Sequence, residues 1–426
     1  MPRYDAVVVG AGVFGLATAY HILEAEPGQR ILVVDKNPGP GMGNTARSAA
    51  AFREFFTSEI NYKLARSSIS YYTSLEEEGV DLGIRMVGYL WLESESSYEE
   101  KMQAISRLKH RLEYRVIDSR EIEEELGLRA EVSRAEEGSL MGLSDVYCGI
   151  YTPRAGLMCS DRLVHHYYGS LREMGCEFMF NRRVGRILLE PVERIGIPGE
   201  PFAWQRVRAG GVVLEGGERI EADRVIVAAG AWTHQLMDAV GIDAHVRPKK
   251  RQVFVVKAST PELARMLDSR GISEEGMPFT ILPGPRVCIR PDFEGRSFWI
   301  LYSDDIGRPF ALEEEPVAER NFYLKGIYHV LVQYFPQFLN RMPSNMWAGH
   351  YAYSTLDRQP VIFEEAGIVV VSGGSGSGIM KADAVGRVAA ALYLGRRWAR
   401  LFGGLSIRVS DLGIKGRRVE EERLVL

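Results

Sequence analysis

The chain has 426 residues, of which 46% are hydrophobic and 25% are charged, and its formal net charge is -4 at pH 7. This composition is typical of a globular protein, and the length exceeds the size at which one hydrophobic core usually stops growing, so we expect two domains. The small net charge gives no reason to expect nucleic acid as a partner, and no apolar run approaches the ~18 residues that a transmembrane helix needs.

The cysteines are scattered and form no Cys-x-x-Cys pair; they are Cys148, Cys159, Cys176 and Cys288. This usage favours a reducing compartment and predicts neither a disulfide framework nor a metal site. We expect no secretory signal, and a protein that is cytoplasmic, either free or peripheral to a membrane.

A strand, a glycine-rich turn and a helix follow one another at the start of the chain. Residues 5–10 (Asp-Ala-Val-Val-Val-Gly) read as a buried strand, and an amphipathic run covers 16–24. In a dinucleotide-binding unit Gly10 makes the turn, Gly12 lets the backbone approach a pyrophosphate, and Gly15 lets the helix pack close to the strand. The helix N-terminus then faces the phosphates.

A second apolar run, 31–34, ends in Asp35, which is placed to accept hydrogen bonds from a ribose hydroxyl. The spacing and the flanking elements therefore favour a dinucleotide site. A tight turn in an unrelated α/β protein is the alternative interpretation.

Small residues and two arginines follow in the segment 43–53. The run from Ala46 to Ala51 lets the backbone lie against a flat ring, and Arg47 and Arg53 supply fixed positive charge on either side of it. Arg47 is suited to a pyrophosphate, and Arg53 to a substrate carboxylate. The alternative is a helix start with solvated arginines.

The glycine triplet, the acid about twenty residues on and the pattern Arg-Ser-x-x-x-x-Arg resemble the D-amino-acid oxidase superfamily of FAD enzymes, which includes sarcosine oxidases, glycine oxidases and dye-linked L-proline dehydrogenases. The resemblance implies an α/β fold: a Rossmann-like FAD-binding domain with a parallel sheet and a β-meander, and an α+β substrate domain on a mixed or antiparallel sheet. We place the discontinuous FAD-binding domain at 1–85, 145–240 and 345–410, the substrate domain at 86–144 and 241–344, and a C-terminal tail at 411–426.

Later segments match the same superfamily. A Gly-turn-strand layout ends at Val184, whose counterpart typically meets the adenine through its backbone. The buried strand before Ala229 and Gly230 resembles the Ala-Ala-Gly-x-Trp motif, with Trp232 in place. Alternating strands over 252–257, 286–290 and 297–302 suit a half-buried antiparallel sheet.

The chain returns to the cofactor domain in a Trp-x-Gly segment from Trp347 and a strand and glycine loop over 368–381. The loop can offer N–H groups to the edge of a flavin and stabilise negative charge on the reduced ring. The residues expected to bind FAD are Gly10, Gly12, Val13, Phe14, Gly15, Asp35, Lys36, Thr45, Ala46, Arg47, Ser48, Ala51, Val184, Ala229, Gly230, Trp232, Gly376, Gly378, Ile379, Met380 and Lys381.

Three positions depart from the superfamily pattern. Gly349 stands where covalent sarcosine oxidases carry the flavin-linking cysteine, which predicts non-covalent FAD. Trp299 aligns with their oxygen-activating lysine, and a neutral residue there favours a dehydrogenase. Met380 aligns with the carboxylate-binding lysine, and Lys381 lies one residue on, which turns its side chain by about 100 degrees on a helix.

The resemblance implies oxidation of the C–N bond of a small amino or imino acid. Arg53, with Arg290 or Lys381, is expected to hold the carboxylate, and Tyr351 to line the pocket or bond the amine; for the tyrosine, packing alone is equally expected.

L-proline with a non-oxygen acceptor is the first choice of reaction, and an oxygen-using sarcosine or glycine oxidase is the second. A third hypothesis makes the chain the FAD subunit of a larger complex, docked through the apolar end 424–426. A nicotinamide-dependent dehydrogenase is the least favoured. The partners expected are the substrate, an unidentified electron acceptor and a second copy of the chain in a homo-oligomer.

Overall fold

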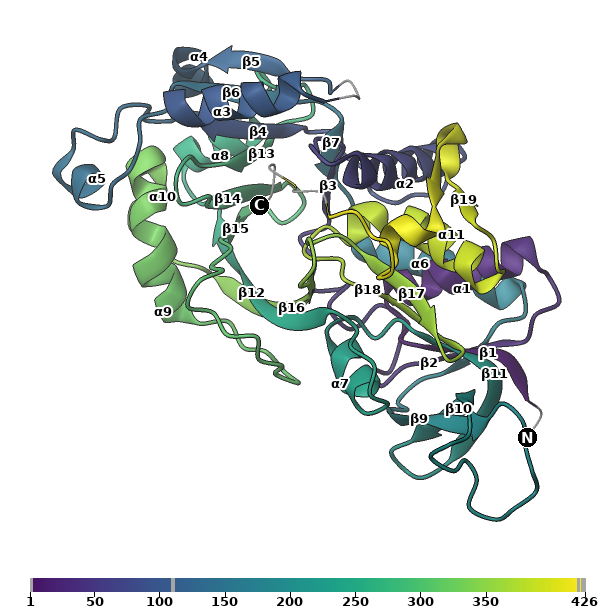
Figure 1. The fold of residues 1–426 in the computed structure, drawn as a ribbon. Helices are drawn as coiled ribbons and strands as arrows, with labels where there is room; N and C mark the ends of the chain where they lie inside the picture. Colours follow the sequence, from purple (N-terminus) through teal and green to yellow (C-terminus); the bar gives the residue numbers. More distant parts are fainter. Residues whose placement is uncertain (1–2, 109–111, 420–421, 423–426) are drawn as a thin grey trace.

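The computed structural model describes residues 3–108, 112–419 and 422, and two large sheets organise them (Figure 1). The apolar end 424–426, suggested above as a docking segment, lies outside the described residues. The expected α/β fold, with a parallel sheet, a meander and a mixed second sheet, is confirmed.

The first sheet has the strand β1 at its centre, with parallel neighbours on both sides. Its strands run in the order β17 (Val361–Glu365), β18 (Ile368–Ser372), β11 (Arg219–Val227), β1 (Tyr4–Val9), β2 (Ile31–Val34) and β8 (Glu177–Met179), with β9 (Val184–Pro191) and β10 (Val207–Leu214) forming an antiparallel meander on β11. Val7 and Val8 point to opposite faces and are both fully buried, as strands covered on both sides require.

Helices cover one face of this sheet. They are α1 (Val13–Ala25), α2 (Glu59–Glu77), α6 (Ser160–Glu173) and α11 (Ala382–Tyr393), and they share a core with Ala6 and Val8. The meander and α7 (Thr233–Asp238) pack on the other face, around Val7 and Val9. The glycine-rich turn between β1 and α1 lies where this sheet meets the second one, because Gly12 lines the same cavity as Gln252 and Tyr351 of the second sheet.

The second sheet is antiparallel except for the parallel pair β4 and β13. Its order is β16 (Asn345–Ser354), β12 (Val246–Lys257), β15 (Ser297–Leu301), β14 (Cys288–Asp292), β13 (Phe279–Ile281), β4 (Tyr89–Glu93), β6 (Cys148–Thr152) and β5 (Arg115–Asp118). The helices around it are α3 (Glu95–Ser106), α4 (Ser119–Leu126), α5 (Glu136–Leu140), α8 (Pro261–Asp268), α9 (Arg320–Phe322) and α10 (Tyr328–Tyr334), the last two joined by a π-helical turn.

Two strands lie in the second sheet although the sequence placed their ranges in the cofactor domain. β6 falls within 145–240 and β16 begins the range 345–410, yet β6 pairs with β4 and β5, and β16 pairs with β12. Pairing partners decide sheet membership, and the local sequence does not reveal them. The ladder between β12 and β16 runs from Val246 opposite Ser354 to Val255 opposite Asn345, and the next strands after β16, β17 and β18, belong to the first sheet.

Two small ladders and the C-terminal segment complete the structure. The ladders join β3 (Ala51–Arg53) to β7 (Ala155–Leu157) and β19 (Trp398–Arg400) to β20 (Ser406–Arg408). Beyond them, Arg417 forms a buried bidentate pair with Asp357, with Nε–Oδ2 and Nη2–Oδ1 distances of 2.8 and 2.6 Å. This part of the expected tail is therefore fixed to the body of the protein.

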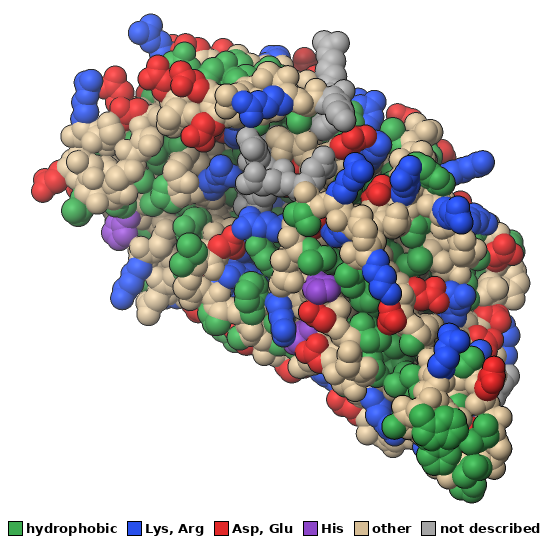
Figure 2. Space-filling model, in the orientation of Figure 1, with side chains coloured by type: hydrophobic (Ala, Val, Ile, Leu, Met, Phe, Trp, Pro, Cys, Tyr) green, Lys and Arg blue, Asp and Glu red, His purple; other side chains and the backbone are tan. Residues whose placement is uncertain are grey.

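One surface region is strongly apolar. The connection between β9 and β10 exposes Val192, Ile195, Ile197 and Trp204, the last by 73%, and Figure 2 shows apolar side chains gathered at this end of the molecule. Among the described residues, no helix combines the length and the apolar character needed to cross a membrane.

Candidate cofactor and substrate site

The glycines after β1 permit contacts that a side chain would block. Gly10 has a φ of +109°, and a Cβ added to it would lie 2.5 Å from the carbonyl oxygen of Ala228 on the neighbouring strand. A Cβ on Gly15 would lie 2.0 Å from the carbonyl oxygen of Gly10. Gly12 caps α1 without a side-chain hydrogen bond, and only Thr45 Oγ1 lies near the place of its missing Cβ, at 3.4 Å. The N–H of Val13 donates to Thr45 Oγ1 at 3.3 Å, and the start of α1 lines the cavity described below.

We expect Gly15→Ala to unfold the cofactor domain more readily, because the new methyl group meets backbone that cannot move aside. The free energy of unfolding in urea should fall by about 2–5 kcal/mol. Gly28→Ala is the matched control: nothing lies within 4 Å of its added Cβ and its φ is not in the left-handed region. Equal stability of the two variants would contradict the role given to Gly15.

A cavity of about 270 Å³ lies in front of the glycine turn and extends between the two sheets. Of the residues expected to bind FAD, it is lined by Gly12, Val13, Phe14, Thr45, Arg47, Ser48, Ala51, Gly230, Gly376, Gly378, Ile379, Met380 and Lys381. Segments that are far apart in the sequence thus meet around one space. Gly10, Gly15, Asp35, Ala46, Val184, Ala229 and Trp232 do not line it.

The carboxylate of Asp35 lies under the glycine turn and accepts backbone hydrogen bonds. Its Oδ2 accepts from the N–H of Ala11 at 2.7 Å, and its Oδ1 accepts from the N–H of Asn37 at 2.8 Å. A contact with ribose therefore stays a prediction. Lys36, the next residue, lines a second cavity of about 690 Å³ together with Arg183.

The glycine loop before α11 packs directly on Tyr351. Gly376 has a φ of +86°, and a Cβ on it would lie 2.4 Å from the tyrosine ring. Tyr351 lines the cavity, and burial raises the pKa of its phenol. The guanidinium carbon of Arg251 lies 5.2 Å from the ring centre. The tyrosine thus contacts both the loop and a cation, and it lines the cavity.

Two buried cationic side chains reach the same cavity. The guanidinium of Arg53 lies 3.9 Å from the ring centre of Phe56, and burial lowers its pKa to about 10. Lys381 is 1% exposed, and its Nζ donates to Asn61 Oδ1 and to Ser377 Oγ, both at 2.6 Å. Burial lowers the pKa of Lys381 to about 7. Arg53 and Lys381 thus both line the cavity, and their binding of a substrate carboxylate stays a prediction.

An acidic residue from the end of the chain also lies in the cavity. The carboxylate of Glu422 accepts from the N–H of Thr57 at 2.9 Å, from its hydroxyl at 2.7 Å and from the N–H of Ser58 at 3.0 Å, at the N-terminus of α2. Burial alone would raise the pKa of this carboxyl, but these hydrogen bonds and the charge of Arg53 lower it. The site therefore already accommodates one carboxylate beside two cations.

Sequence reasoning missed both Glu422 and Asn61. Nothing in the local pattern around Glu422 marks it, because its place depends on the route of the C-terminal segment. Asn61 is 2% exposed on the buried face of α2, and a polar residue at such a helical position was the available signal.

Arg290 and Trp299 do not take the places expected of them. The Nε of Arg290 donates to the carbonyl oxygen of Ala49 at 2.5 Å and its Nη1 to that of Pro291 at 3.1 Å, and Arg290 does not line the cavity. Trp299 lies opposite it on β15, under its guanidinium at 4.0 Å, and edge-on to Trp347. Trp299 contacts its cross-strand neighbour and does not line the cavity, so its position does not support a dehydrogenase over an oxidase.

Known proteins resemble this chain in sequence and in fold. A family model described as DAO, FAD dependent oxidoreductase, matches residues 5–392. FAD-dependent oxidoreductase domain-containing protein 1 of Xenopus laevis is 23% identical over 430 residues, covering 92% of this chain and 79% of the relative. Glycine oxidase of Pseudomonas aeruginosa is 26% identical over 281 residues, covering 62% and 66%. The solved L-proline dehydrogenase from P. horikoshii superposes with a TM-score of 0.72 at 20% identity over 97% of each chain, which shows a shared fold.

Proposed function

Because the chain belongs to the DAO family of FAD-dependent oxidoreductases, we propose that it oxidises the C–N bond of a small amino or imino acid. The observation that carries the proposal is the meeting of Arg53 and Lys381 in a small cavity that also contains the two glycine motifs. A cationic pair suits a substrate carboxylate, and the apolar part of the lining suits a small hydrocarbon body.

The residues of the site fit FAD. Gly12 and Gly230 leave space where other residues would carry a Cβ, since nothing lies within 4 Å of a Cβ on Gly230. The N-terminus of α1 offers N–H groups to a pyrophosphate, and the loop at Gly376 and Gly378 offers N–H groups to the flavin edge. FAD, when bound, supplies the acceptor for the hydride that leaves the substrate carbon.

The side chains around the cavity would orient the substrate. Arg53 and Lys381 would hold the carboxylate of the substrate. This would fix the position of the carbon that loses the hydride. Tyr351 would accept or donate a hydrogen bond at the amine, and Phe56 would form an apolar wall of the pocket. The C–N bond becomes a C=N bond when the carbon gives up the hydride and the nitrogen gives up a proton, which passes to solvent.

L-proline with a dye or a quinone as acceptor is our first proposal for the reaction. It is supported by the likeness of the whole chain to a solved L-proline dehydrogenase. An amino-acid oxidase that uses oxygen is the second candidate, because glycine oxidases are among the relatives and the cation of Arg251 also lines the cavity. A role as the FAD subunit of a larger complex would require a partner chain for turnover.

The deciding experiment mixes the FAD-loaded protein with L-proline without oxygen and follows flavin absorbance. Bleaching that persists in air and reverses with an artificial dye supports a proline dehydrogenase. Rapid recolouring in air with formation of peroxide supports the oxidase instead. Absence of bleaching with L-proline, sarcosine, glycine and D-amino acids would overturn the proposal. Gel filtration of the active sample decides between a single kind of chain and a larger complex.

We also expect FAD to be released when the protein is precipitated with acid, since Gly349 provides no thiol for a covalent bond. Cys288 lines the cavity, but burial raises the pKa of its thiol to about 12, which disfavours the reactive thiolate. The measurement is the absorbance of supernatant and pellet. A yellow pellet that turns colourless in Cys288→Ser would reveal an unexpected covalent link.

A further inference from the structure

A carboxylate from the second sheet's side of the molecule reaches the outer end of the cofactor site. Glu314 lies in the connection between β15 and α9, and both of its oxygens contact Arg183, with Oε1–Nη1 and Oε2–Nη2 distances of 3.0 and 2.6 Å. Its Oε2 also accepts from Lys36 Nζ at 2.6 Å, and its Oε1 accepts from Trp232 Nε1 at 3.0 Å. The carboxylate of Glu314 therefore accepts hydrogen bonds from the side chains of three residues.

The three donors come from three separate segments of the cofactor domain. Lys36 follows β2, Arg183 precedes β9, and Trp232 follows β11, with Lys36 Nζ 3.6 Å from the tryptophan ring centre. Lys36 and Trp232 are residues that the sequence assigned to FAD, and Arg183 directly precedes a third, Val184. Glu314, Lys36 and Arg183 also line the second cavity. The contact thus lies across the space assigned to the adenosine half of the cofactor.

The hydrogen bond from Arg183, with those of Lys36 and Trp232, lowers the pKa of Glu314 to about 2. The carboxylate is therefore charged at every pH at which the protein would be studied. A bidentate arginine contact with a second cation beside it is stronger and more specific in direction than an ordinary exposed ion pair.

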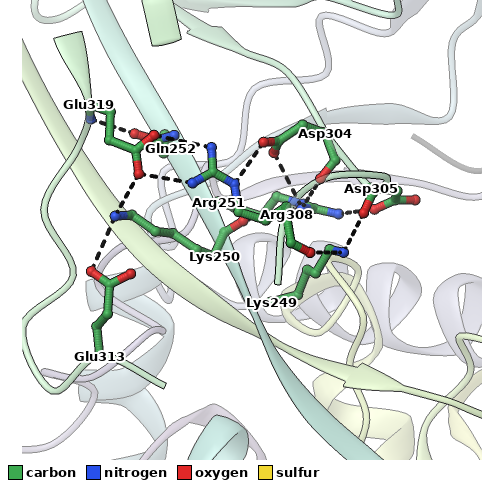
Figure 3. A network of polar contacts seen from close by, with 9 residues as sticks. All are labelled: Lys249, Lys250, Arg251, Gln252, Asp304, Asp305, Arg308, Glu313 and Glu319. Carbon is green, nitrogen blue, oxygen red and sulfur yellow. Dashed lines mark hydrogen bonds and ion pairs between the residues drawn. The ribbon is translucent and has the colours of Figure 1, made fainter. Parts of the chain in front are cut away.

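The base of this connection is fixed to β12, as Figure 3 shows. Lys250 contacts Glu313 and Glu319 at 3.2 and 3.0 Å. Arg308 contacts Asp304 and Glu319 at 2.7 and 2.9 Å. These bonds hold both ends of the connection that carries Glu314. The connection is therefore ordered before any cofactor binds.

Lys249 adds to this base by donating to the carbonyl oxygens of Asp305 and Arg308, at 2.6 and 2.8 Å. Arg251 forms an ion pair with the carboxylate of Asp305. Three consecutive residues of β12 therefore bind this segment, and at its tip Glu315 pairs with Arg47 at 3.0 Å.

We propose that residues 304–319 form a clasp over the adenosine half of the FAD site, and that Glu314 is the latch by which this clasp holds the cofactor in place. The latch bonds are formed with the protein alone, so the barrier that they create acts on entry and exit of FAD equally. The clasp rests on FAD binding and is independent of which amino acid is oxidised. By slowing the release of FAD, the clasp would keep the cofactor on a chain that has no covalent link to the flavin.

The test compares rates of FAD release and uptake in wild type and in Glu314→Gln. Glu314 is half exposed at the surface, so the amide is expected to fold like the native side chain. Release is started by diluting the FAD-loaded protein and followed by the rise in flavin fluorescence. Uptake is followed by quenching of added FAD with the FAD-free protein.

A latch predicts that Glu314→Gln releases FAD about tenfold faster and also takes it up faster, with a small change in affinity. Asp268→Asn is the matched control, because Asp268 likewise accepts from both terminal nitrogens of one arginine, Arg296, at 2.5 and 2.8 Å and is about half exposed, but it lies outside the clasp and lines neither cavity; its release rate should equal that of wild type. Added salt should speed release from wild type more than from Glu314→Gln.

Two outcomes would overturn the proposal. Unchanged release from Glu314→Gln would make the contact an ordinary surface ion pair. Slower release together with tighter binding would mean that the carboxylate competes with a phosphate of FAD for Lys36 and Arg183. Neither outcome depends on amino-acid turnover, so a failure of the proposed function and a failure of the clasp can be told apart.

Discussion

We expect Arg53→Gln to lower kcat/KM for the amino-acid substrate by roughly 30- to 4,000-fold, corresponding to about 2–5 kcal/mol for removing one partner of a buried ion pair. The loss should lie mainly in KM if the arginine only binds the carboxylate, and in kcat as well if it also sets the position of the reacting carbon. Steady-state kinetics with a dye acceptor measures both.

Arg290→Gln is the control variant, because it also removes a buried guanidinium but one that is not expected to bind substrate. Burial lowers the pKa of Arg290 to about 10, as it does for Arg53, but its guanidinium donates to backbone carbonyls and does not line the cavity. The two variants should therefore lose comparable stability, and only Arg53→Gln should lose substrate affinity. A larger rise in KM for Arg290→Gln would reverse the assignment made here. FAD content and the thermal midpoint are measured for both.

The second large effect concerns pH. A pKa of about 7 for Lys381 means that its ammonium is present below pH 7 in the ligand-free protein and is lost as the pH rises. An anionic ligand held by this ammonium should therefore bind more weakly above pH 7, by up to tenfold for each pH unit until the contribution of Lys381 is gone. The charges that face Lys381 are those of Glu422, Arg53 and Asp357.

The appropriate probe is cyclopentanecarboxylate, because it has no amine to titrate between pH 6 and 9. Its inhibition constant should rise through pH 7 in wild type and stay level in Lys381→Met. A level profile in wild type would show that Lys381 stays charged or lies too far from the ligand. Substrate turnover alone would not decide this, because loss of the substrate's amine proton raises kcat/KM over the same range.

The backbone of the cofactor site could be predicted from the sequence because its constraints are local. Gly10 and Gly15 lie where a Cβ would collide with backbone, and the apolar run of β1 is buried on both faces. Such requirements leave a signature within about ten residues. The same holds for Gly376, whose neighbour Tyr351 was also recognised from a short motif.

Side-chain direction and long-range contacts could not be predicted in this way. Arg290 has the sequence context of a substrate ligand, yet its pairing opposite Trp299 turns it toward Ala49. Glu314 belongs to an acidic run that reads as solvated surface, and its role depends on three donors between 82 and 278 residues away. These contacts are set by how the two sheets meet, which no local pattern encodes.

The central place of β1 in the first sheet affects how the chain folds while it is synthesised on the ribosome. β1 can pair with β2 soon after both are made, but its other neighbour, β11, begins only at Arg219, and the strand beyond that, β18, begins at Ile368. Long-range parallel pairing of this kind is slow, and it leaves one side of β1 without its partner meanwhile. The nascent chain should therefore depend on chaperones until β18 has been synthesised, and truncations before β18 should aggregate instead of yielding an isolated nucleotide-binding domain.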